Sequence, residues 1–164
     1  MTDHAGASDE VAMSSSLLLE DQMCFGLYAA SRAITAVYRP LLERLGLTYP
    51  QYLVMLVLWQ RGPSTVKQVT TALHLDYGTL TPLLKRLEAL GYVQRQRRPD
   101  DERSVRVSLT DAGAALRDRA GEVPLEISRA LGLTAPQTAQ LRDLLQRVCA
   151  NAADYSESHP GATR

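Results

Sequence analysis

Apolar residues recur at helical spacing through the middle of the chain and then alternate with polar residues at strand spacing. The helical stripe consists of Leu80, Leu83, Leu84, Leu87 and Leu90, and it stops at Gly91. The alternating apolar residues that follow are Tyr92, Val93, Val105, Val107 and Leu109. Between the two alternating segments, residues 97–103 form a turn that is too highly charged to be buried. This order predicts a winged helix, with the helix in the DNA major groove and the hairpin at the backbone or minor groove.

Ahead of this block, the apolar pattern predicts one long helix. It runs from about Leu17 to Leu45 with Ser16 as its possible cap, and Pro40 must bend or break it. Residues 1–15 are small and polar, which predicts a disordered N-terminal tail.

Two shorter helices are expected between the long helix and the central one. The apolar run 52–59 indicates a buried helix that begins at Pro50 and ends before Gly62, and a third helix follows Ser64 as its cap. The third helix, a short connector at 74–76 and the central helix form a helix-turn-helix.

The start of the central helix has two solutions. Thr81 as the cap with Pro82 at the first helical position is favourable chemistry. Asp76 as the cap starts the helix earlier, but it places Gly78 and Pro82 inside the helix. The pattern alone favours the later start.

After the hairpin, two more helices are expected. Thr110 caps the first, which begins at Asp111, bends near Pro124 and runs toward Leu131, and the last helix starts at Thr134.

These elements predict a mainly α fold with a small β-hairpin wing, in a single chain over 16–164. Residues 50–110 form the winged helix-turn-helix DNA-binding lobe. The stripes of the outer helices cannot all pack on so small a core, so 17–48 and 111–155 are predicted to be dimerisation helices. The result is a two-fold homodimer that binds two half-sites of double-stranded DNA.

Charge supports this picture only locally. The 164 residues have a formal net charge of zero, so the overall charge does not indicate nucleic acid. Residues 85–106, however, contain seven basic and four acidic residues, and this basic patch can compete for phosphate. The basic residues are Lys85, Arg86, Arg95, Arg97, Arg98, Arg103 and Arg106.

Other classes of function are excluded by what the sequence lacks. No apolar run reaches membrane length, and the N-terminus has neither the basic start nor the apolar core of a signal peptide, so a cytoplasmic protein is expected. The two cysteines form neither a disulfide framework nor a metal-ligand spacing, and no metal or cofactor is expected.

Cys24 lies on the apolar side of the first helix, with Tyr28 one turn later and Tyr38 fourteen residues on. Fourteen helical residues span about 21 Å, so Cys24 and Tyr38 can meet only if the first helices of two subunits cross antiparallel. Phenol hydroxyls beside a thiol hydrogen-bond its thiolate and favour a nucleophile for peroxide. Periodicity alone still favours the simpler interpretation, in which the thiol is a small buried hydrophobe.

A specific combination of residues is spread over 19–28, 38–42, 45–53, 75–76, 78–88 and 101–103. It strongly resembles the organic hydroperoxide resistance regulators, which are the peroxide-sensing branch of the MarR family of winged-helix repressors. The resemblance covers residues 17 to about 125.

The resemblance implies a role for each residue that surrounds the thiol. Cys24 matches the peroxidatic cysteine, which organic hydroperoxides oxidise to sulfenic acid. Tyr38 and Tyr49 match the tyrosines that hydrogen-bond it from the partner subunit, and Tyr28 and Phe25 match further residues of the pocket.

The resemblance also implies a DNA interface. The recognition helix spans residues 76–86 and therefore begins before Pro82. Arg103 matches the arginine of the wing, and Asp101 matches its salt-bridge partner. The DNA-binding residues expected are Asp76, Tyr77, Gly78, Thr79, Thr81, Lys85, Arg86, Arg97, Arg98 and Arg103.

The chain departs from the family pattern at two places. Position 77 is tyrosine where serine is usual, which leaves its DNA contact open. A resolving cysteine is absent from 125–132, and Cys149 lies in the final helix instead. Cys149 resolves Cys24 if that helix crosses the first one, although a buried structural thiol is the simpler interpretation. The other route is a mixed disulfide with a low-molecular-weight thiol.

The function expected is therefore a homodimeric repressor that organic hydroperoxides release from operator DNA by oxidising Cys24. One alternative is a MarR-type repressor that a small phenolic or aromatic ligand releases, with Cys24 structural. A thiol peroxidase is a weaker alternative because the chain has no resolving or recycling motif, and the protein is not expected to be an enzyme.

Overall fold

The computed structural model describes residues 17–98 and 101–159, with side chains described outside 97–104. In chain order the elements are η1 (Leu19–Asp21), α1 (Met23–Glu43), α2 (Tyr49–Arg61), β1 (Ser64–Thr65), α3 (Val66–Leu73), α4 (Tyr77–Ala89), β2 (Val93–Arg98), β3 (Asp101–Leu109), α5 (Asp111–Ala120), α6 (Val123–Leu131) and α7 (Ala135–Ser158). The tail predicted for residues 1–15 lies outside the described residues.

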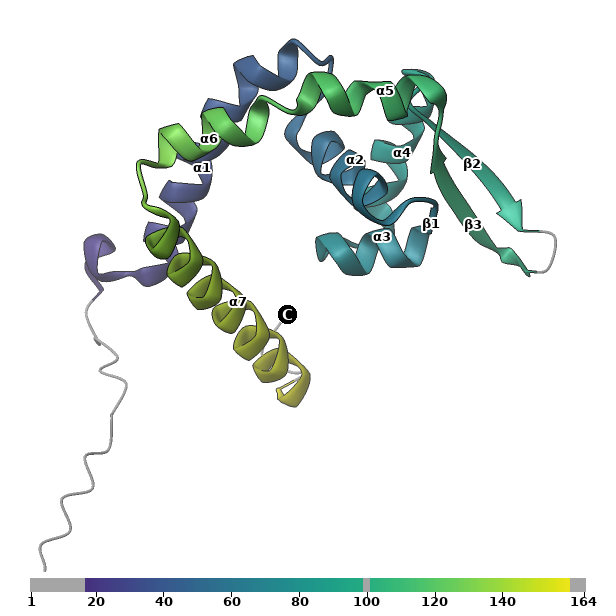
Figure 1. The fold of residues 1–164 in the computed structure, drawn as a ribbon. Coiled ribbons are helices and arrows are strands. Elements are labelled where there is room, and N and C mark those ends of the chain that lie inside the picture. The colour runs from purple at the N-terminus through teal and green to yellow at the C-terminus, as the bar shows by residue number, and fades with distance from the viewer. Residues whose placement is uncertain (1–16, 99–100, 160–164) are drawn as a thin grey trace, which may run out of the picture.

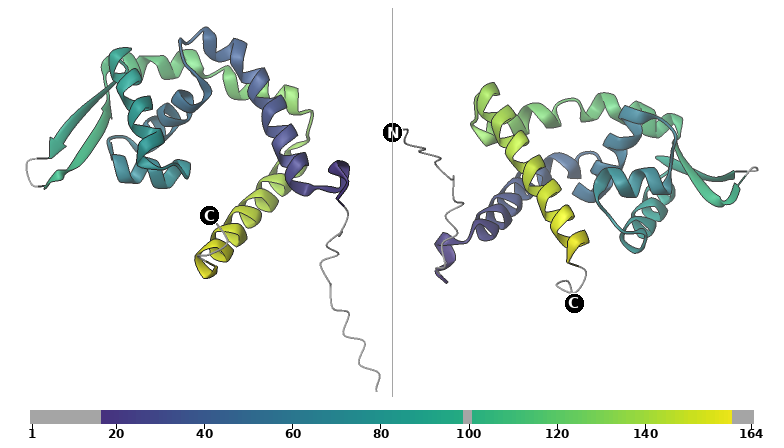
Figure 2. Two further views of the ribbon diagram at one scale, coloured as in Figure 1. Left: turned by 180° about the vertical axis from the view of Figure 1, so that it is seen from behind. Right: turned by 90° about the horizontal axis from the view of Figure 1, so that it is seen from below.

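The elements form a lobe and an arm. The lobe contains α2 to α5 and the sheet, while α1 and α6 pack side by side in the arm and α7 extends from its end (Figure 1). The other two views show that the arm stays on one side of the lobe (Figure 2). The mainly α winged-helix fold predicted from the sequence is confirmed.

The core of the lobe is built from the predicted helical stripe. Leu80, Leu84 and Leu87 of α4 are fully buried, while Leu90 at the end of the stripe is exposed. Leu42 at the end of α1 joins the same core. The 3.6-residue period therefore identified the inner face of α4 correctly.

The predicted hairpin is present, and a third strand extends its sheet. The strand order is β1-β3-β2, with both pairings antiparallel. The two-residue strand β1 was not predicted. It pairs Ser64 with Val107, so the backbone is extended at the residue expected to cap α3. The cap is Thr65, whose hydroxyl accepts from the backbone N–H of Gln68, while the hydroxyl of Ser64 donates to the carbonyl of Gly62.

The first helix starts later than predicted and ends within two residues of its predicted end. A short 3-10 turn and Gln22 precede it, and it begins at Met23, whereas Ser16 lies outside the described residues. The helix does not end at Pro40 but continues to Glu43. Proline removes one backbone hydrogen bond, and the burial of Leu42 in the core offsets that loss.

The segment after the hairpin is two helices rather than one bent helix. α5 ends at Ala120, and Pro124 stands in the first turn of α6, where proline fits without loss. The predicted caps Thr110 and Thr134 are confirmed, since each side chain accepts a hydrogen bond from the first turn of its helix.

α5 packs against the base of the wing. The backbone of Gly113 lies against Tyr92, so that a Cβ atom at position 113 would stand 1.9 Å from the Tyr92 carbonyl oxygen. The indole nitrogen of Trp59 donates to the Gly113 carbonyl at 2.9 Å, and the Thr110 hydroxyl donates to the Gly91 carbonyl at 2.5 Å. α5 is thus fastened to α2 and the wing. None of the helices described is both long and apolar enough to cross a bilayer.

Candidate DNA interface and thiol site

Asp76 caps the N-terminus of α4, the second helix of the helix-turn-helix. Its carboxylate accepts from the Thr79 backbone N–H at 2.7 Å and from the Thr79 hydroxyl at 2.8 Å. These hydrogen bonds, above all the backbone one, hold the pKa of Asp76 below its usual value. The earlier start that the resemblance implied is confirmed, and the later start favoured by the pattern is wrong. The Thr81 hydroxyl caps nothing and donates back to the Tyr77 carbonyl at 2.7 Å.

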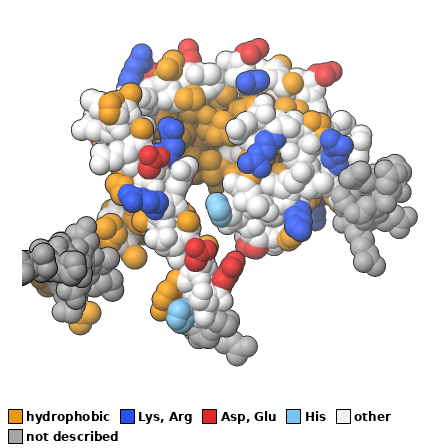
Figure 3. All heavy atoms as spheres, turned by 60° about the horizontal axis from the view of Figure 1, so that its bottom comes forward, with side chains coloured by type: hydrophobic (Ala, Val, Ile, Leu, Met, Phe, Trp, Pro, Cys, Tyr) orange, Lys and Arg blue, Asp and Glu red, His pale blue; other side chains and the backbone are white. Residues whose placement is uncertain are grey.

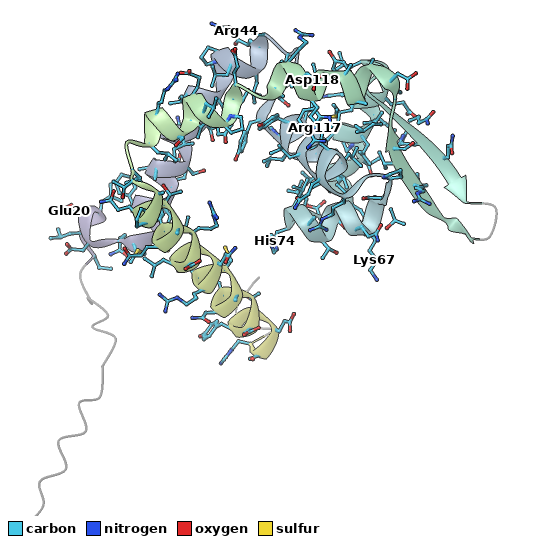
Figure 4. The ribbon with its side chains drawn as sticks, viewed as in Figure 1. Glu20, Arg44, Lys67, His74, Arg117 and Asp118 are labelled. Atoms are coloured by element: carbon cyan, nitrogen blue, oxygen red, sulfur yellow. The ribbon has the colours of Figure 1, made fainter. Side chains whose placement is uncertain are left out.

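The turn before this helix is tight. His74 ends α3 in the left-handed backbone region, with φ of 52°, and α4 begins three residues after it. His74 and Lys67 project from α3 at the same face of the lobe (Figure 4). Together, α3, the turn and α4 form the predicted helix-turn-helix.

The outward face of α4 carries most of the predicted DNA-binding residues. Exposed residues at this end and along this face are Asp76, Tyr77, Gly78, Thr79, Lys85 and Arg86, while Thr81 is half-buried. The lysine and the arginine are free of ion pairs among the described residues. This face can therefore present the Asp76 carboxylate and uncharged groups at its start and two cations near its end.

Two residues of the basic patch make polar contacts with other residues of the same chain. Arg95 of β2 pairs with Glu88 of α4, with guanidinium nitrogens 2.5 Å and 2.9 Å from one carboxylate oxygen. A guanidinium nitrogen of Arg106 donates to the Pro63 carbonyl at 3.4 Å. Of the four basic residues in the predicted cluster whose side chains the structure describes, two thus make contacts within the chain and two, Lys85 and Arg86, face outward.

The tip of the wing falls outside the described side chains. The backbone pairs Arg97 with Val105 and Arg98 with Asp101, which gives the hairpin its register. The contacts of Arg97, Arg98 and Arg103 with DNA, and the salt bridge from Asp101, stay predictions.

Cys24 lies in the first turn of α1 and is exposed within the single chain. Phe25 and Tyr28 beside it are also exposed. The guanidinium of Arg32 lies 5.6 Å from the centre of the Tyr28 ring and donates to its hydroxyl at 3.3 Å. Cys149 on α7 is exposed as well. Within one chain, neither thiol is the buried hydrophobe that periodicity favoured.

Tyr38, Tyr49 and Tyr52 form a second feature, which we call the tyrosine cluster. The ring centres of Tyr38 and Tyr49 are 4.7 Å apart, and those of Tyr38 and Tyr52 are 5.9 Å apart. Burial, with help from the two neighbouring phenols, raises the pKa of Tyr38 to about 12. Burial also raises the pKa values of Tyr49 and Tyr52. All three hydroxyls therefore keep their protons at neutral pH and are able to donate hydrogen bonds.

The structure does not bring Cys24 to the tyrosine cluster of its own chain. Cys24 is at the first turn of α1 and Tyr38 is near its end, so about 21 Å of continuous helix separates them. Glu20, just ahead of α1, lies at the far end of the arm, whereas Arg44, just after it, lies toward the lobe (Figure 4). Tyr52 was not singled out from the sequence, although its position one turn after Tyr49 on α2 was a signal.

The outer helices carry apolar residues that no other described part of the chain covers. Apolar side chains gather in the hollow between the arm and the lobe (Figure 3). α7 has no buried residue, although its aliphatic side chains recur at helical spacing. Its exposed aliphatic residues are Leu141, Leu144, Leu145 and Val148.

Two clefts border these features. One, of about 680 Å³, lies between α1 and the start of α2 and includes Arg32, Arg39 and Tyr49. The other, of about 670 Å³, lies between α2 and α5 and includes Tyr52, Trp59 and Arg117. No group of three potential metal ligands occurs in the part of the chain that was searched, which is 17–98 and 101–159.

A capped, outward-facing helix with a wing beside it defines a winged-helix DNA-binding protein. Residues 36–119 match the family model described as transcriptional regulator SarA/Rot. The chain is 49% identical over 126 residues to the organic hydroperoxide resistance transcriptional regulator of Bacillus subtilis strain 168, across 77% of this chain and 84% of that protein. The chain belongs to the MarR family of winged-helix transcriptional regulators, as the sequence resemblance implied.

Solved structures agree with this assignment. Reduced AbfR bound to DNA is 36% identical, with a TM-score of 0.70 over 82% of this chain and 93% of that one. A mutant of Escherichia coli MarR complexed with operator DNA is 29% identical, with a TM-score of 0.72 over 81% and 99%. AbfR, from Staphylococcus epidermidis, is also known in a disulfide form, at 34% identity and a TM-score of 0.58 over 85% and 92%. The chain is thus a DNA-binding transcriptional regulator, and its relatives are named as regulators rather than enzymes.

Proposed function

We propose that the protein is a homodimeric repressor that binds operator DNA when Cys24 is reduced and leaves it when an organic hydroperoxide oxidises Cys24. One observation carries the proposal. An exposed thiol stands at one end of α1, and protonated phenols, about 21 Å away, stand at the other end. If the α1 helices of two subunits cross antiparallel, each thiol meets the phenols of its partner.

The uncovered apolar surface supports a second copy of this chain as the partner. The stripe on α7 has the spacing of a helix that packs against another helix, and Leu125 on α6 and Val37 on α1 are also exposed. Residues 17–48 and 111–155 are thus proposed as the dimerisation layer. Within this range, α5 also packs on the lobe through Leu116 and Ala120.

The chemistry at Cys24 is a displacement at peroxide oxygen. The thiolate sulfur attacks one oxygen of the hydroperoxide, an S–O bond forms and the O–O bond breaks. The leaving alkoxide takes a proton and departs as an alcohol, so the peroxide is reduced and the thiol is oxidised to sulfenic acid. Phenol O–H groups of Tyr38 and Tyr49 donate to the thiolate and then to the leaving oxygen.

Oxidation then acts on DNA binding through the interface. The sulfenic acid is larger than the thiolate and accepts hydrogen bonds differently, so helices that pack around it shift. Two recognition helices must match the spacing of consecutive major grooves, and small shifts therefore lower affinity strongly. The relative AbfR has solved structures in a reduced DNA-bound form, an overoxidised DNA-bound form and a disulfide form, which supports a redox-active regulator in this family and favours disulfide formation as the releasing step.

The fate of the sulfenic acid has two candidates. Cys149 is exposed on α7 and is proposed as a resolving thiol only if α7 of either subunit reaches Cys24. Otherwise a low-molecular-weight thiol forms a mixed disulfide. The intact mass after one equivalent of hydroperoxide distinguishes a bridge between the cysteines from an added thiol.

Replacement of each cysteine tests the proposal. Cys24→Ser is expected to bind operator as the unchanged protein does and to stay bound when cumene hydroperoxide is added. Cys149→Ser is the matched control and is expected to be released. Release of the Cys24→Ser protein by the peroxide in a mobility-shift assay would contradict the proposal.

A second candidate rests on the cleft between α2 and α5. Tyr52 and Trp59 offer aromatic walls and Arg117 offers a cation, which suits an aromatic carboxylate as a releasing ligand. An aromatic acid such as benzoate is then expected to release the Cys24→Ser protein and the unchanged protein equally. Arg117→Ala is the variant that abolishes this response if the second candidate is right.

A further inference from the structure

Tyr77 is the first residue of α4, and its side chain is 55% exposed. It is the only aromatic residue of a helix whose other large apolar side chains mostly face the core. Within the described part of the chain its hydroxyl has no hydrogen-bond partner. A large ring therefore stands in solvent at the end of α4 that leads into a DNA groove in helix-turn-helix proteins.

The polar groups around Tyr77 are already in use. The Asp76 carboxylate accepts hydrogen bonds from the backbone N–H and the hydroxyl of Thr79, so the Thr79 hydroxyl has no proton left to donate to DNA. The Thr81 proton goes to the Tyr77 carbonyl, and Gly78 has no side chain. The first turn of α4 thus has few groups left to distinguish one base from another, and the Tyr77 ring is the largest of them.

The cations of α4 stand apart from Tyr77. Lys85 follows it by eight residues, which is about 12 Å along the helix and about 80° around it. A cation at that distance suits a phosphate at the edge of the groove, while the ring lies over the bases. The C-terminal part of α4 is therefore suited to a phosphate contact and its N-terminal end to a base contact.

The negative charge of Asp76 disfavours a phosphate and favours an uncharged base edge beside the Tyr77 ring. Asp76 directly precedes Tyr77, and its hydrogen bonds lower the pKa of its carboxyl, so it stays ionised at neutral pH. A phosphate at the Tyr77 hydroxyl would be repelled by that carboxylate, whereas base edges carry no net charge. Among base edges in the major groove, the C5-methyl of thymine is the apolar one.

We propose that the ring of Tyr77 packs against the C5-methyl of a thymine in each half-site and so sets part of the operator sequence. The inference deepens the proposed function, because it rests on α4 entering the major groove. It does not depend on what releases the protein.

The test begins with sites that the unchanged protein selects from a randomised DNA pool. Each thymine of the selected half-site is then replaced by deoxyuridine, which lacks only the methyl group. We expect one position at which the replacement weakens binding by about three- to fivefold, the value of one buried methyl group. Tyr77→Phe keeps the ring and is expected to show the same penalty, while Tyr77→Ala shows none and accepts other bases there.

Lys85→Ala is the matched control, since Lys85 is an exposed residue of the same helix and carries no ring. It is expected to weaken binding to all sequences alike, to reduce the salt dependence and to keep the deoxyuridine penalty. Tyr77→Ala with the same site preference and the same penalty would overturn the inference, and so would loss of the penalty in Tyr77→Phe. If the unchanged protein enriches no site at all, the proposed function itself fails, which is a different result.

Discussion

Glu88 at the end of the recognition helix and Arg95 in the wing are joined side chain to side chain. Both guanidinium contacts go to one carboxylate oxygen, and the other oxygen accepts from the Arg95 backbone N–H at 3.3 Å. A rigid link between α4 and β2 results, because the pairing fixes the carboxylate through three donors. This ion pair therefore helps to fix the angle between the helix and the wing, together with the hydrogen bond from the Tyr92 backbone N–H to the Leu87 carbonyl.

Replacing Glu88 by Gln is expected to weaken this link and to lower operator affinity several-fold while the helix content stays the same. The hydrogen bonds from Arg95 lower the pKa of Glu88, so the pair stabilises the folded protein above the usual glutamate pKa of 4.5. That contribution is lost as the pH falls through the lowered value. The difference in unfolding free energy between the two proteins should thus be present at pH 7 and vanish in acid.

Fluorescence anisotropy of labelled operator and urea unfolding at several pH values measure the two effects. Arg103→Ala provides the comparison, because it is expected to weaken binding and to lower the salt slope by about one without touching the Glu88 pair. Equal affinity of Glu88→Gln and the unchanged protein would mean that the wing is held without this link.

Tyr38 predicts a distinct response to alkali. Its pKa is about 12 in the folded protein and 10.0 when it is unperturbed, so the folded state keeps the proton longer than the unfolded chain does. The corresponding stability is fully present below pH 10 and is lost as the pH rises through about 12. Urea unfolding at stepped pH should show a loss that is smaller in Tyr38→Phe; identical curves would show that Tyr38 is not shielded from water.

Gly113 predicts a loss of stability. A Cβ atom at 113 meets the Tyr92 carbonyl oxygen at 1.9 Å, and that oxygen belongs to backbone that also accepts from Thr110. Gly113→Ala is therefore expected to destabilise the protein by about 1 to 3 kcal/mol. Gly121→Ala is the control, since a Cβ atom there makes an ordinary 3.4 Å contact with the Asp118 carbonyl oxygen. Thermal unfolding of both variants checks this, and equal melting temperatures would contradict it.

The sequence predicted those parts of the fold that depend on neighbouring residues. The leucine stripe of α4 follows from helical spacing, and the caps Thr110 and Thr134 follow from local hydrogen bonding. An error arose where a distant residue determines the local structure. Ser64 was expected to cap a helix, but it is a strand residue because Val107 pairs with it.

The site was predictable to a similar degree. Local pattern placed α4 too late, because the Asp76 and Thr79 hydrogen bonds outweigh the interior Pro82. The tyrosine cluster joins residues of α1 and α2 across a turn, and no periodicity reports such a contact. The exposure of Cys24 follows from its place in the first turn of α1, away from the core of the lobe, which only the three-dimensional arrangement gives.

The central claim is that the phenols of one subunit serve the thiol of the other, and two matched heterodimers test it most directly. In the first, one subunit carries Cys24→Ser and the other carries Tyr38→Phe with Tyr49→Phe. In the second, one subunit carries all three changes and the other is unaltered. Each heterodimer therefore keeps a single Cys24, and the rate of its conversion to sulfenic acid by cumene hydroperoxide is measured by intact mass.

The account predicts that the first heterodimer reacts at the normal rate per thiol, since its Cys24 faces intact tyrosines. The second should react at about one tenth of that rate or below it, because its Cys24 faces two phenylalanines that cannot donate a hydrogen bond to a charged sulfur. Equal rates, or a faster second heterodimer, would contradict the account.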